Sequence, residues 1–308
     1  MTSIEIEGET RQPNGSARSG DLDASQLTPL ARSSARPRLI RWRGRNLILG
    51  AVMITFIVAV AIFAPVIAPR GPQDTDYGAR LIPPSREHLF GTDNLGRDIF
   101  SRVLYGASID LQVGIISVVP PFLIGTVLGC LAGYYGGRID NVVMRAADII
   151  QAFPFLILII AIVAVLGIGL TSVYIAVAIV AWVSYARLIR GEILVAKNQE
   201  YVEAARSLGG SDGRVIVRHV LPNVITSALV FATTDVMLYI VLVTSLSYLG
   251  LAARPPSPEW GAMITEGRTF MASAWWISLF PGLAVVVTGI AFSVFGDGLA
   301  DALRVRRR

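Results

Sequence analysis

Four long stretches without any charged residue constrain this chain more than any other feature. They cover residues 46–69, 111–137, 149–186 and 269–296. A helix that crosses a membrane needs about 20 predominantly apolar residues, so each stretch is long enough to cross at least once. The third stretch can hold two helices, with Gly167–Ser172 (GIGLTS) as the turn between them. Residues 223–246, which are interrupted only by Asp235, are also long enough.

These stretches predict an all-α membrane protein with six transmembrane helices. We expect the helices over about residues 46–67, 111–131, 149–167, 172–189, 223–246 and 277–296. A soluble protein is not expected, because helices that are apolar on every face for about 20 residues cannot all be buried in a chain of 308 residues. A cleaved signal peptide is not expected either, since the first apolar stretch begins late, is too long and lacks a convincing cleavage site.

The basic residues are distributed unevenly between the two sides that six helices define. On the side of both termini, the segments next to the helices contain 16 Lys and Arg residues, against 7 in the opposite loops. Because cytoplasmic loops carry an excess of Lys and Arg, we expect both termini in the cytoplasm. The net charge of +5 is therefore interpreted as a topology signal and as contact with anionic membrane lipid, not as nucleic-acid binding.

The segments outside the helices differ in composition. Residues 1–37 are rich in Ser, Gly, Pro, Arg and acidic residues and lack apolar periodicity, which predicts a disordered cytoplasmic tail. Residues 38–107 hold the first helix and a long extracytoplasmic loop, about 68–106. From Asp98 the apolar residues of this loop recur at helical spacing, so we expect a short helix at the membrane interface.

The residues that catalysis or metal binding would need are missing or scattered. Lys197 is the only lysine and follows Ala196, whereas a phosphate-binding loop needs Gly directly before Lys and Ser or Thr after it. His88 and His219 are expected on opposite membrane faces, and Cys130 is interpreted as a small packing residue in an apolar span. We therefore expect no ATP hydrolysis, no metal and no cofactor in this chain, and an enzymatic function has little support.

A polar segment, EYVEAARSLGGSDGRVIVRHVLPN (residues 200–223), interrupts the apolar sequence. The apolar residues of its first half fall on one helical face: Tyr201, Val202, Ala204, Ala205 and Leu208. Gly209–Gly210 is typical of a helix end, and Ser211 or Asp212 can cap a second short helix that stops at Pro222. We expect a helix–turn–helix at the cytoplasmic surface, which either lies on lipid or is approached closely by another protein.

The pattern of residues in this segment favours a protein partner. Six residues resemble the EAA signature of permeases in ABC importers: Glu203, Ala204, Ala205, Gly209, Leu221 and Pro222. In that family the segment forms coupling helices that dock into a cleft on the cytoplasmic ATPase. The resemblance therefore implies that these residues, within the loop of residues 196–222, couple the chain to an ATPase. His219 departs from the family pattern, which usually has an apolar residue there.

The resemblance extends over roughly residues 40 to 304. Three further stretches are similar to the C-type permease of dipeptide and oligopeptide importers, a group with nickel and glutathione relatives: HLFGTDNLGRDIFSRVLYGA (88–107), PPSPEWGAMI (255–264) and GDGLADAL (296–303). The resemblance implies a type I ABC importer permease fold, with residues 108–301 as the ABC type-1 transmembrane domain and residues 302–308 as a basic cytoplasmic tail. Ser108 and Asp110 depart from the family pattern of Arg and Ser at these positions.

The family resemblance also implies a function and a set of partners. The chain would be a cell inner membrane permease subunit that forms half of a translocation pathway, with di- or oligopeptides as substrate. Its partners would be a second permease, two cytoplasmic ATPase subunits or domains, and an extracytoplasmic substrate-binding protein. A nickel or glutathione importer of the same family is the nearest alternative, and an ion-coupled secondary carrier is an alternative of a different class.

Asp235 is the candidate residue of the translocation path. A charged side chain in the middle of a span costs about 2.5–3.5 kcal/mol on insertion scales, so it is expected to face protein or water instead of lipid. Two interpretations remain open from the residues alone. Asp235 either lines a cavity and meets a cationic group of the substrate, or it accepts a hydrogen bond from a neighbouring helix.

Overall fold

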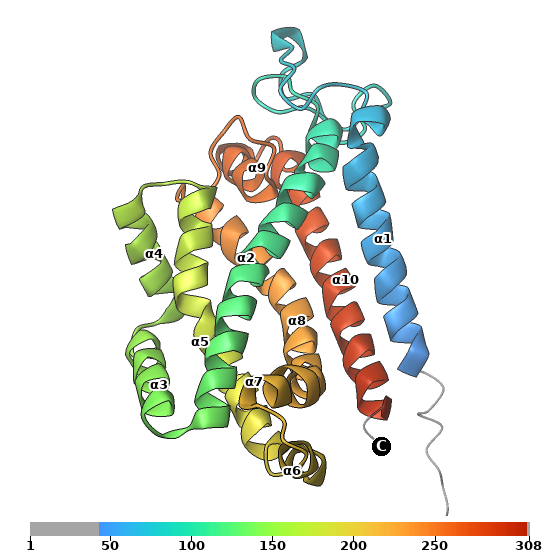
Figure 1. Cartoon of the computed structure of the whole chain (residues 1–308). Helices are drawn as coiled ribbons and strands as arrows, with labels where there is room; N and C mark the ends of the chain where they lie inside the picture. The colour runs from blue at the N-terminus through green and yellow to red at the C-terminus, as the bar shows by residue number, and fades with distance from the viewer. Residues whose placement is uncertain (1–42, 307–308) are drawn as a thin grey trace, which may run out of the picture. The chain divides into compact units, whose positions relative to one another are not determined.

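The computed structural model describes residues 43–306, so the tail predicted for residues 1–37 lies outside the described part. The described residues all belong to one compact unit. The regular structure of residues 43–306 is helical, apart from an isolated bridge between Thr92 and Asp98 (Figure 1). Its α-helices are α1 Arg43–Ile67, α2 Ile99–Tyr135, α3 Gly137–Gln151, α4 Phe155–Leu166, α5 Leu170–Ala196, α6 Glu200–Ser207, α7 Asp212–Val215, α8 Leu221–Tyr248, α9 Trp260–Gly267 and α10 Trp276–Arg306.

Five helical segments of the described residues are long and apolar enough to cross a membrane: α1, α2, α5, the continuous helix from α7 through α8, and α10. A sixth span is completed if the bent pair of α3 and α4 counts as one crossing. The prediction of an all-α membrane protein is confirmed. A turn is also found where Gly167–Ser172 predicted one, because α4 ends at Leu166 and α5 begins at Leu170.

The straight helix predicted over residues 149–167 is wrong. α3 ends at Gln151 and α4 begins at Phe155, and the two helices meet at an angle of 88°. Pro154 occupies the position before α4 with extended backbone (φ −58°, ψ 129°). A proline disfavours the helical conformation of the residue that precedes it, so the chain turns at Phe153 instead of continuing as one helix.

The separate interfacial helix predicted from Asp98 is also wrong, because it is continuous with the next span. Asp98 caps α2 by accepting a hydrogen bond from the Ser101 backbone N–H at 2.8 Å, and the helix then continues for 37 residues. α2 carries two charged residues, Arg102 and Asp110, which would be costly to expose to lipid. Both side chains are instead buried against residues of the 253–267 region, so the helix can continue past them without exposing charge to lipid.

α2 and α5 pack closely because three glycines lie along one face of α2. Gly125, Gly129 and Gly133 are spaced four residues apart, so they form a stripe on the helix surface. A Cβ atom on Gly129 would lie 2.6 Å from the carbonyl oxygen of Ala186, and one on Gly133 would lie 3.0 Å from the carbonyl oxygen of Arg190. Small residues at such an interface let two membrane helices approach at backbone distance.

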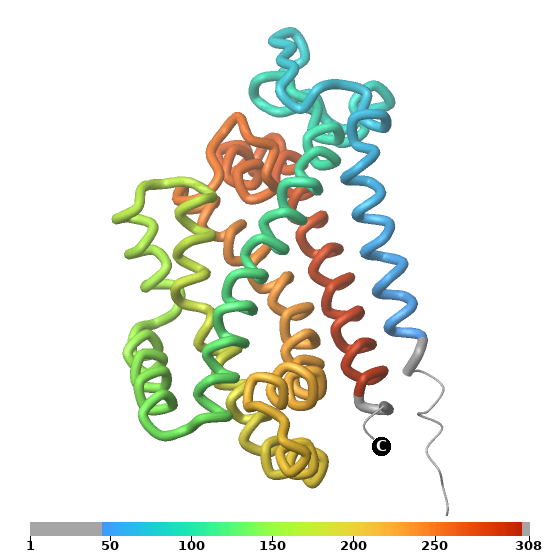
Figure 2. The backbone as a smooth tube through the Cα atoms, viewed as in Figure 1, coloured from blue at the N-terminus to red at the C-terminus, as the bar shows by residue number. Residues whose placement is uncertain are grey.

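The short helices gather at the two ends of the bundle. Figure 1 shows α6 and α7 at one end, together with the start of α1 and the end of α10. Figure 2 shows that α9 and the loop that follows α1 lie at the opposite end. We refer to residues 68–98 and 249–275 together as the cap. His88 belongs to the cap and His219 to the opposite end, so the structure does not bring the two histidines together.

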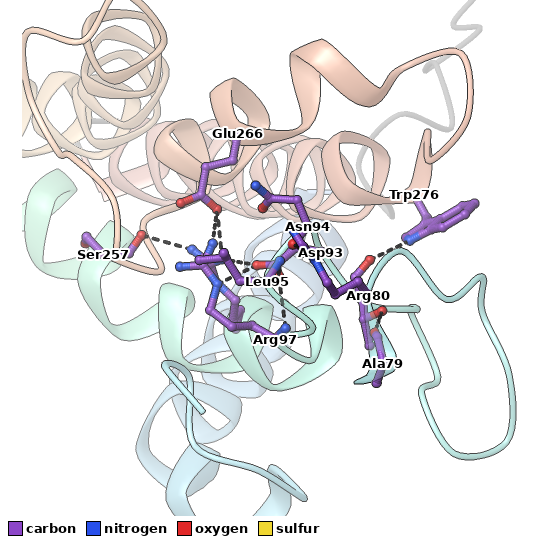
Figure 3. Close-up of polar contacts among 11 residues, drawn as sticks. Ala79, Arg80, Asp93, Asn94, Leu95, Arg97, Ser257, Glu266 and Trp276 are labelled. Carbon is purple, nitrogen blue, oxygen red and sulfur yellow. Dashed lines mark hydrogen bonds and ion pairs between the residues drawn. The ribbon is translucent and has the colours of Figure 1, made fainter. Parts of the chain in front are cut away.

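A buried ion network joins the two parts of the cap to α2 (Figure 3). Asp93 accepts a bond from Arg97 Nε at 2.5 Å and one from Arg102 Nη1 at 2.6 Å. Both arginines also donate to Glu266 of α9 at 2.8 Å. Removing one partner of a buried ion pair costs about 3–5 kcal/mol, so the network holds α9 firmly on the start of α2.

Backbone contacts extend this attachment. The Trp276 indole N–H donates to the carbonyl of Thr92 at 3.1 Å (Figure 3), and Asp110 of α2 accepts the backbone N–H of Trp260 at 3.1 Å. Glu259 caps α9 by accepting the N–H groups of Gly261 and Ala262. Burial raises the pKa of the Glu259 carboxyl above its ordinary value. The motifs at residues 88–107 and 255–264 thus meet in three dimensions and form one structural unit.

Candidate coupling segment and cavity

Residues 200–222 form a compact segment at the end of the bundle opposite the cap. α6 ends at Ser207, and Gly209 takes the left-handed conformation (φ +81°) that the Gly-Gly pair predicts. The N–H of Gly210 donates to the carbonyl of Ala205, and that of Gly209 to the carbonyl of Arg206. These two bonds form a Schellman motif, which satisfies carbonyls that the end of α6 leaves without a helical partner.

The helix stop predicted at Pro222 is wrong. α7 begins after Ser211, which takes the N-cap position without a capping bond from its side chain. A π-helical turn over Ile216–Val220 then leads directly into α8, and the Leu221 N–H donates to the carbonyl of Ile216. Pro222 therefore falls in the first turn of α8. Proline is tolerated there because the π-helical turn directly before it already interrupts the regular α-helical hydrogen bonds.

The inward face of this segment is apolar and continues the core of the bundle. Val202, Val215, Ile216 and Val220 are buried in one cluster with residues of α2, α5 and α8. Leu221 of the signature packs against this cluster. The segment is thus held to the membrane helices by hydrophobic burial, which stabilises by about 1.5–3 kcal/mol for each large aliphatic side chain.

The five apolar residues that were predicted to share one helical face differ in burial. Val202 is buried and Ala205 is half-buried, but Tyr201, Ala204 and Leu208 are exposed. At 100° per residue these three side chains lie within about 60° of one another, so they form a second stripe beside the buried one. We call Tyr201, Ala204 and Leu208 the exposed stripe.

The exposed stripe has no apolar cover from the residues that the structure describes. The side chain of Leu208 is 88% exposed and that of Tyr201 is 41% exposed. Glu203 is exposed on the same helix, and its carboxylate makes no hydrogen bond or ion pair with any residue in the range 43–306. Apolar side chains that gather on one exposed helix face beside a carboxylate are typical of a protein interface.

Polar contacts attach the segment to the end of α2. The Tyr134 hydroxyl donates to Asp212 Oδ1 at 2.8 Å and accepts a bond from Arg206 Nε at 3.3 Å. Lys197 Nζ donates to the carbonyl of Gly133 at 2.9 Å. The sequence analysis missed Tyr134, because nothing in the order of residues indicates that it meets Asp212.

Asp235 lies in the wall of a cavity of about 400 Å³ between α5, α8 and the α3–α4 bend. Its side chain is 5% exposed, and Oδ2 accepts a bond from the Tyr239 hydroxyl at 3.3 Å. Tyr239 belongs to the same helix, one turn further on. The cavity wall contains further polar groups from Gln151 and Ser184, which the sequence analysis did not single out.

Comparison with known families decides what kind of protein carries these features. A family described as "Binding-protein-dependent transport system inner membrane component" matches residues 125–308. A second family, "N-terminal TM domain of oligopeptide transport permease C", matches residues 45–84. The chain belongs to these permease families. It is the permease subunit of an ABC importer and a multi-pass inner membrane protein, and the alternative of an ion-coupled secondary carrier is excluded.

Curated relatives agree with this assignment. This permease is 48% identical over 265 residues to the glutathione transport system permease protein GsiD of Escherichia coli, which covers 85% of this chain and 88% of that protein. It is 44% identical over 257 residues to GsiD of Pectobacterium atrosepticum, covering 83% and 85%. It is 43% identical over 256 residues to the dipeptide transport system permease protein DppC of Alkalihalophilus pseudofirmus, covering 83% and 84%.

Solved structures share the fold of the permease at low sequence identity. The MetNI methionine ABC transporter in an inward-facing conformation matches with a TM-score of 0.52 and 19% identity, over 67% of this chain and 97% of that chain. An amino acid ABC transporter solved with histidines matches with a TM-score of 0.51 and 17% identity, over 68% and 95%. The expected ABC importer permease fold is therefore confirmed.

Proposed function

We propose that this permease imports di- or oligopeptides and forms half of the translocation pathway, with a second, homologous permease as the other half. The names of its relatives support this substrate class, because glutathione is itself a tripeptide and the second relative is a dipeptide permease. A glutathione importer is thus one case of the same proposal. No observation favours nickel over a peptide.

The 200–222 segment is the proposed docking site of the ATPase. The observation that carries this proposal is the exposed stripe of Tyr201, Ala204 and Leu208, since these apolar side chains lie beside the unpaired carboxylate of Glu203 on an otherwise well-packed segment. An interface that covers the stripe removes its apolar surface from water and gives Glu203 a basic partner. ATP is then bound and hydrolysed by the partner subunits, and this chain needs no cofactor of its own.

The proposed orientation places the 200–222 segment and both termini in the cytoplasm. Its support is the excess of Lys and Arg at this end of the bundle. The cap then faces the extracytoplasmic side, where a substrate-binding protein delivers the peptide. The ion network of Asp93, Arg102 and Glu266 gives this partner a rigid surface.

Asp235 is the proposed contact for the cationic end of the substrate. One observation supports a place in the path: its carboxylate borders the 400 Å³ cavity, where its hydroxyl partners are Tyr239 of its own helix and Tyr185 of α5. A carboxylate in a cavity wall at this depth attracts a free amino group strongly, because the surrounding medium screens charge poorly.

The docking proposal is tested by the composition of the purified complex. Leu208→Ser removes the most exposed apolar side chain of the stripe, and Glu203→Lys reverses the charge beside it. Both variants should lower the ratio of ATPase to permease in affinity-purified importer. For Glu203→Lys the physical reason is that loss of a desolvated interfacial charge pair costs about 2–5 kcal/mol. Leu208→Met and Glu200→Lys are the matched controls, which keep the apolar side chain and alter a different exposed acid of α6. Wild-type ATPase content in both test variants would refute the docking site.

A further inference from the structure

We propose that Tyr134 is a positioning residue that fixes the 200–222 segment to α2, so that movement of the segment is transmitted to that helix. This inference rests on the proposed function of the segment as the ATPase docking site. It adds a specific hydrogen-bonded connection between the proposed docking surface and the membrane helices.

The hydroxyl group of Tyr134 forms hydrogen bonds to both short helices of the segment. Tyr134 lies in the last turn of α2 and its side chain is 7% exposed. It donates to Asp212 of α7 at 2.8 Å and accepts from Arg206 of α6 at 3.3 Å. The Arg206 guanidinium also lies 5.0 Å from the centre of the Tyr134 ring. The hydroxyl is therefore placed between an acidic and a basic group, where hydrogen bonds are stronger than between neutral partners.

The turn between α6 and α7 has little packing of its own. Leu208 is exposed, and a Cβ atom on Gly209 would meet no atom within 4 Å. α6 has only eight residues and therefore few hydrogen bonds to keep it rigid, whereas α7 is the start of the continuous helix through α8. Tyr134 contacts the segment on both sides of this turn. It can therefore hold α6 and α7 in a fixed relation to α2 while a partner moves them.

α2 is long and packs against several other helices, so it can carry a displacement from one end of the bundle to the other. Its 37 residues span about 55 Å at 1.5 Å per residue. Lys197 Nζ donates to the carbonyl of Gly133, which adds a second attachment at the same end of the helix. At the other end, Arg102 holds Glu266 of the cap. A displacement of the segment at Tyr134 is thus passed to a helix that also contacts α5, α8 and the cap.

A purely structural role for Tyr134 makes a different prediction. Its ring is part of the cluster that contains Cys130, Ile193 and Val202, and Tyr134→Phe keeps that ring. The variant removes only the hydroxyl group. If the ring alone matters, the variant should behave as the wild type in every assay.

The experiment compares Tyr134→Phe with Tyr135→Phe in the complete importer, reconstituted in proteoliposomes. Tyr135 is the next residue of α2; its side chain is 48% exposed and its hydroxyl makes no hydrogen bond within residues 43–306. The readout is the amount of dipeptide taken up per ATP hydrolysed. We expect Tyr134→Phe to lower this ratio by about threefold to tenfold, the range for loss of one hydrogen bond, and Tyr135→Phe to leave it unchanged.

Further measurements separate positioning from assembly. Both variants should retain the wild-type ATPase content and thermal midpoint, and Tyr134→Phe combined with Asp212→Asn should lose no more than the stronger of the two single variants. The proposal is overturned if Tyr134→Phe keeps the wild-type ratio, if Tyr135→Phe loses as much, or if the loss is accompanied by a lower midpoint. Failure of the docking site itself would be recognised separately, because Leu208→Ser would then retain its ATPase.

Discussion

Gly209 determines how α6 ends, and its role is local backbone geometry. A side chain at this position has room, since no atom lies within 4 Å of a built Cβ, but the φ of +81° is unfavourable for any residue other than glycine. The left-handed conformation costs an L-residue about 1–2 kcal/mol, and more for a β-branched one. The constraint on this residue is thus conformational and not a matter of space.

Gly209→Val should therefore reduce uptake and substrate-stimulated ATP hydrolysis while the permease still inserts into the membrane. The expected cause is that α6 no longer ends in the Schellman motif, so the exposed stripe is turned away from the ATPase. Gly209→Asn is the matched control, because Asn adopts the left-handed conformation more readily and should retain more activity. Normal stimulated hydrolysis by a correctly assembled Gly209→Val importer would contradict this role.

The charge of Asp235 is tested by Asp235→Asn, which keeps the size and hydrogen-bonding capacity of the side chain. The variant should impair uptake of dipeptides with a free amino terminus more than uptake of N-acetylated dipeptides, with assembly unchanged. Tyr239→Phe removes the donor of the Asp235 hydrogen bond but leaves the carboxylate, so it should preserve this selectivity. An equal loss for both substrates together with poor assembly would assign Asp235 to packing.

The residues that sequence alone could identify are those whose role depends on their neighbours in the chain. Gly209 follows a short amphipathic helix, and Asp235 interrupts an apolar stretch, so both are visible in the sequence. Tyr134 is not, because its partners Arg206 and Asp212 are 72 and 78 residues away. The sequence also does not show that Leu208 points outward. An apolar residue on a helix can face either the core or a partner protein, and the order of residues does not distinguish the two.

At the scale of the elements, long uncharged stretches locate the spans well but do not fix where helices begin and end. The helix predicted over residues 111–131 is part of α2, which begins at Ile99 because Arg102 and Asp110 find buried partners in the cap. The span predicted over residues 149–167 breaks at Pro154, where covalent geometry prevails over hydrophobicity. Both differences come from interactions that a hydropathy pattern does not contain.

The packing of α2 against α5 gives a prediction at this scale. Gly129→Leu would place a side chain where even a Cβ lies 2.6 Å from the Ala186 carbonyl oxygen, so the two helices must separate. Overpacking costs about 1–3 kcal/mol, and we expect a lower thermal midpoint and a lower yield of assembled importer. Val127→Leu enlarges an exposed residue of the same helix and should have little effect. An unchanged midpoint in Gly129→Leu would show that the glycine stripe is not required for this contact.

At the scale of the whole molecule, the described residues place the cap and the 200–222 segment at opposite ends of a bundle of long helices. α2 contacts both ends, and α8 continues from the docking segment past the cavity that Asp235 lines. Under the proposed coupling, a partner that moves the 200–222 segment alters the cavity at a distance. The work of ATP hydrolysis can then be done outside this chain, which contains no phosphate-binding loop.

ATP-dependent uptake of a labelled dipeptide into proteoliposomes that contain the complete importer tests the central claim most directly. The ATPase subunits and ATP are placed in the vesicle lumen, and the binding protein and the labelled substrate are supplied outside. We predict that dipeptide and glutathione accumulate on the ATPase side only when ATP is present there, and that Leu208→Ser removes most of this uptake. Accumulation driven by an imposed proton gradient without ATP, or undiminished uptake by Leu208→Ser, would contradict the proposed coupling through the 200–222 segment.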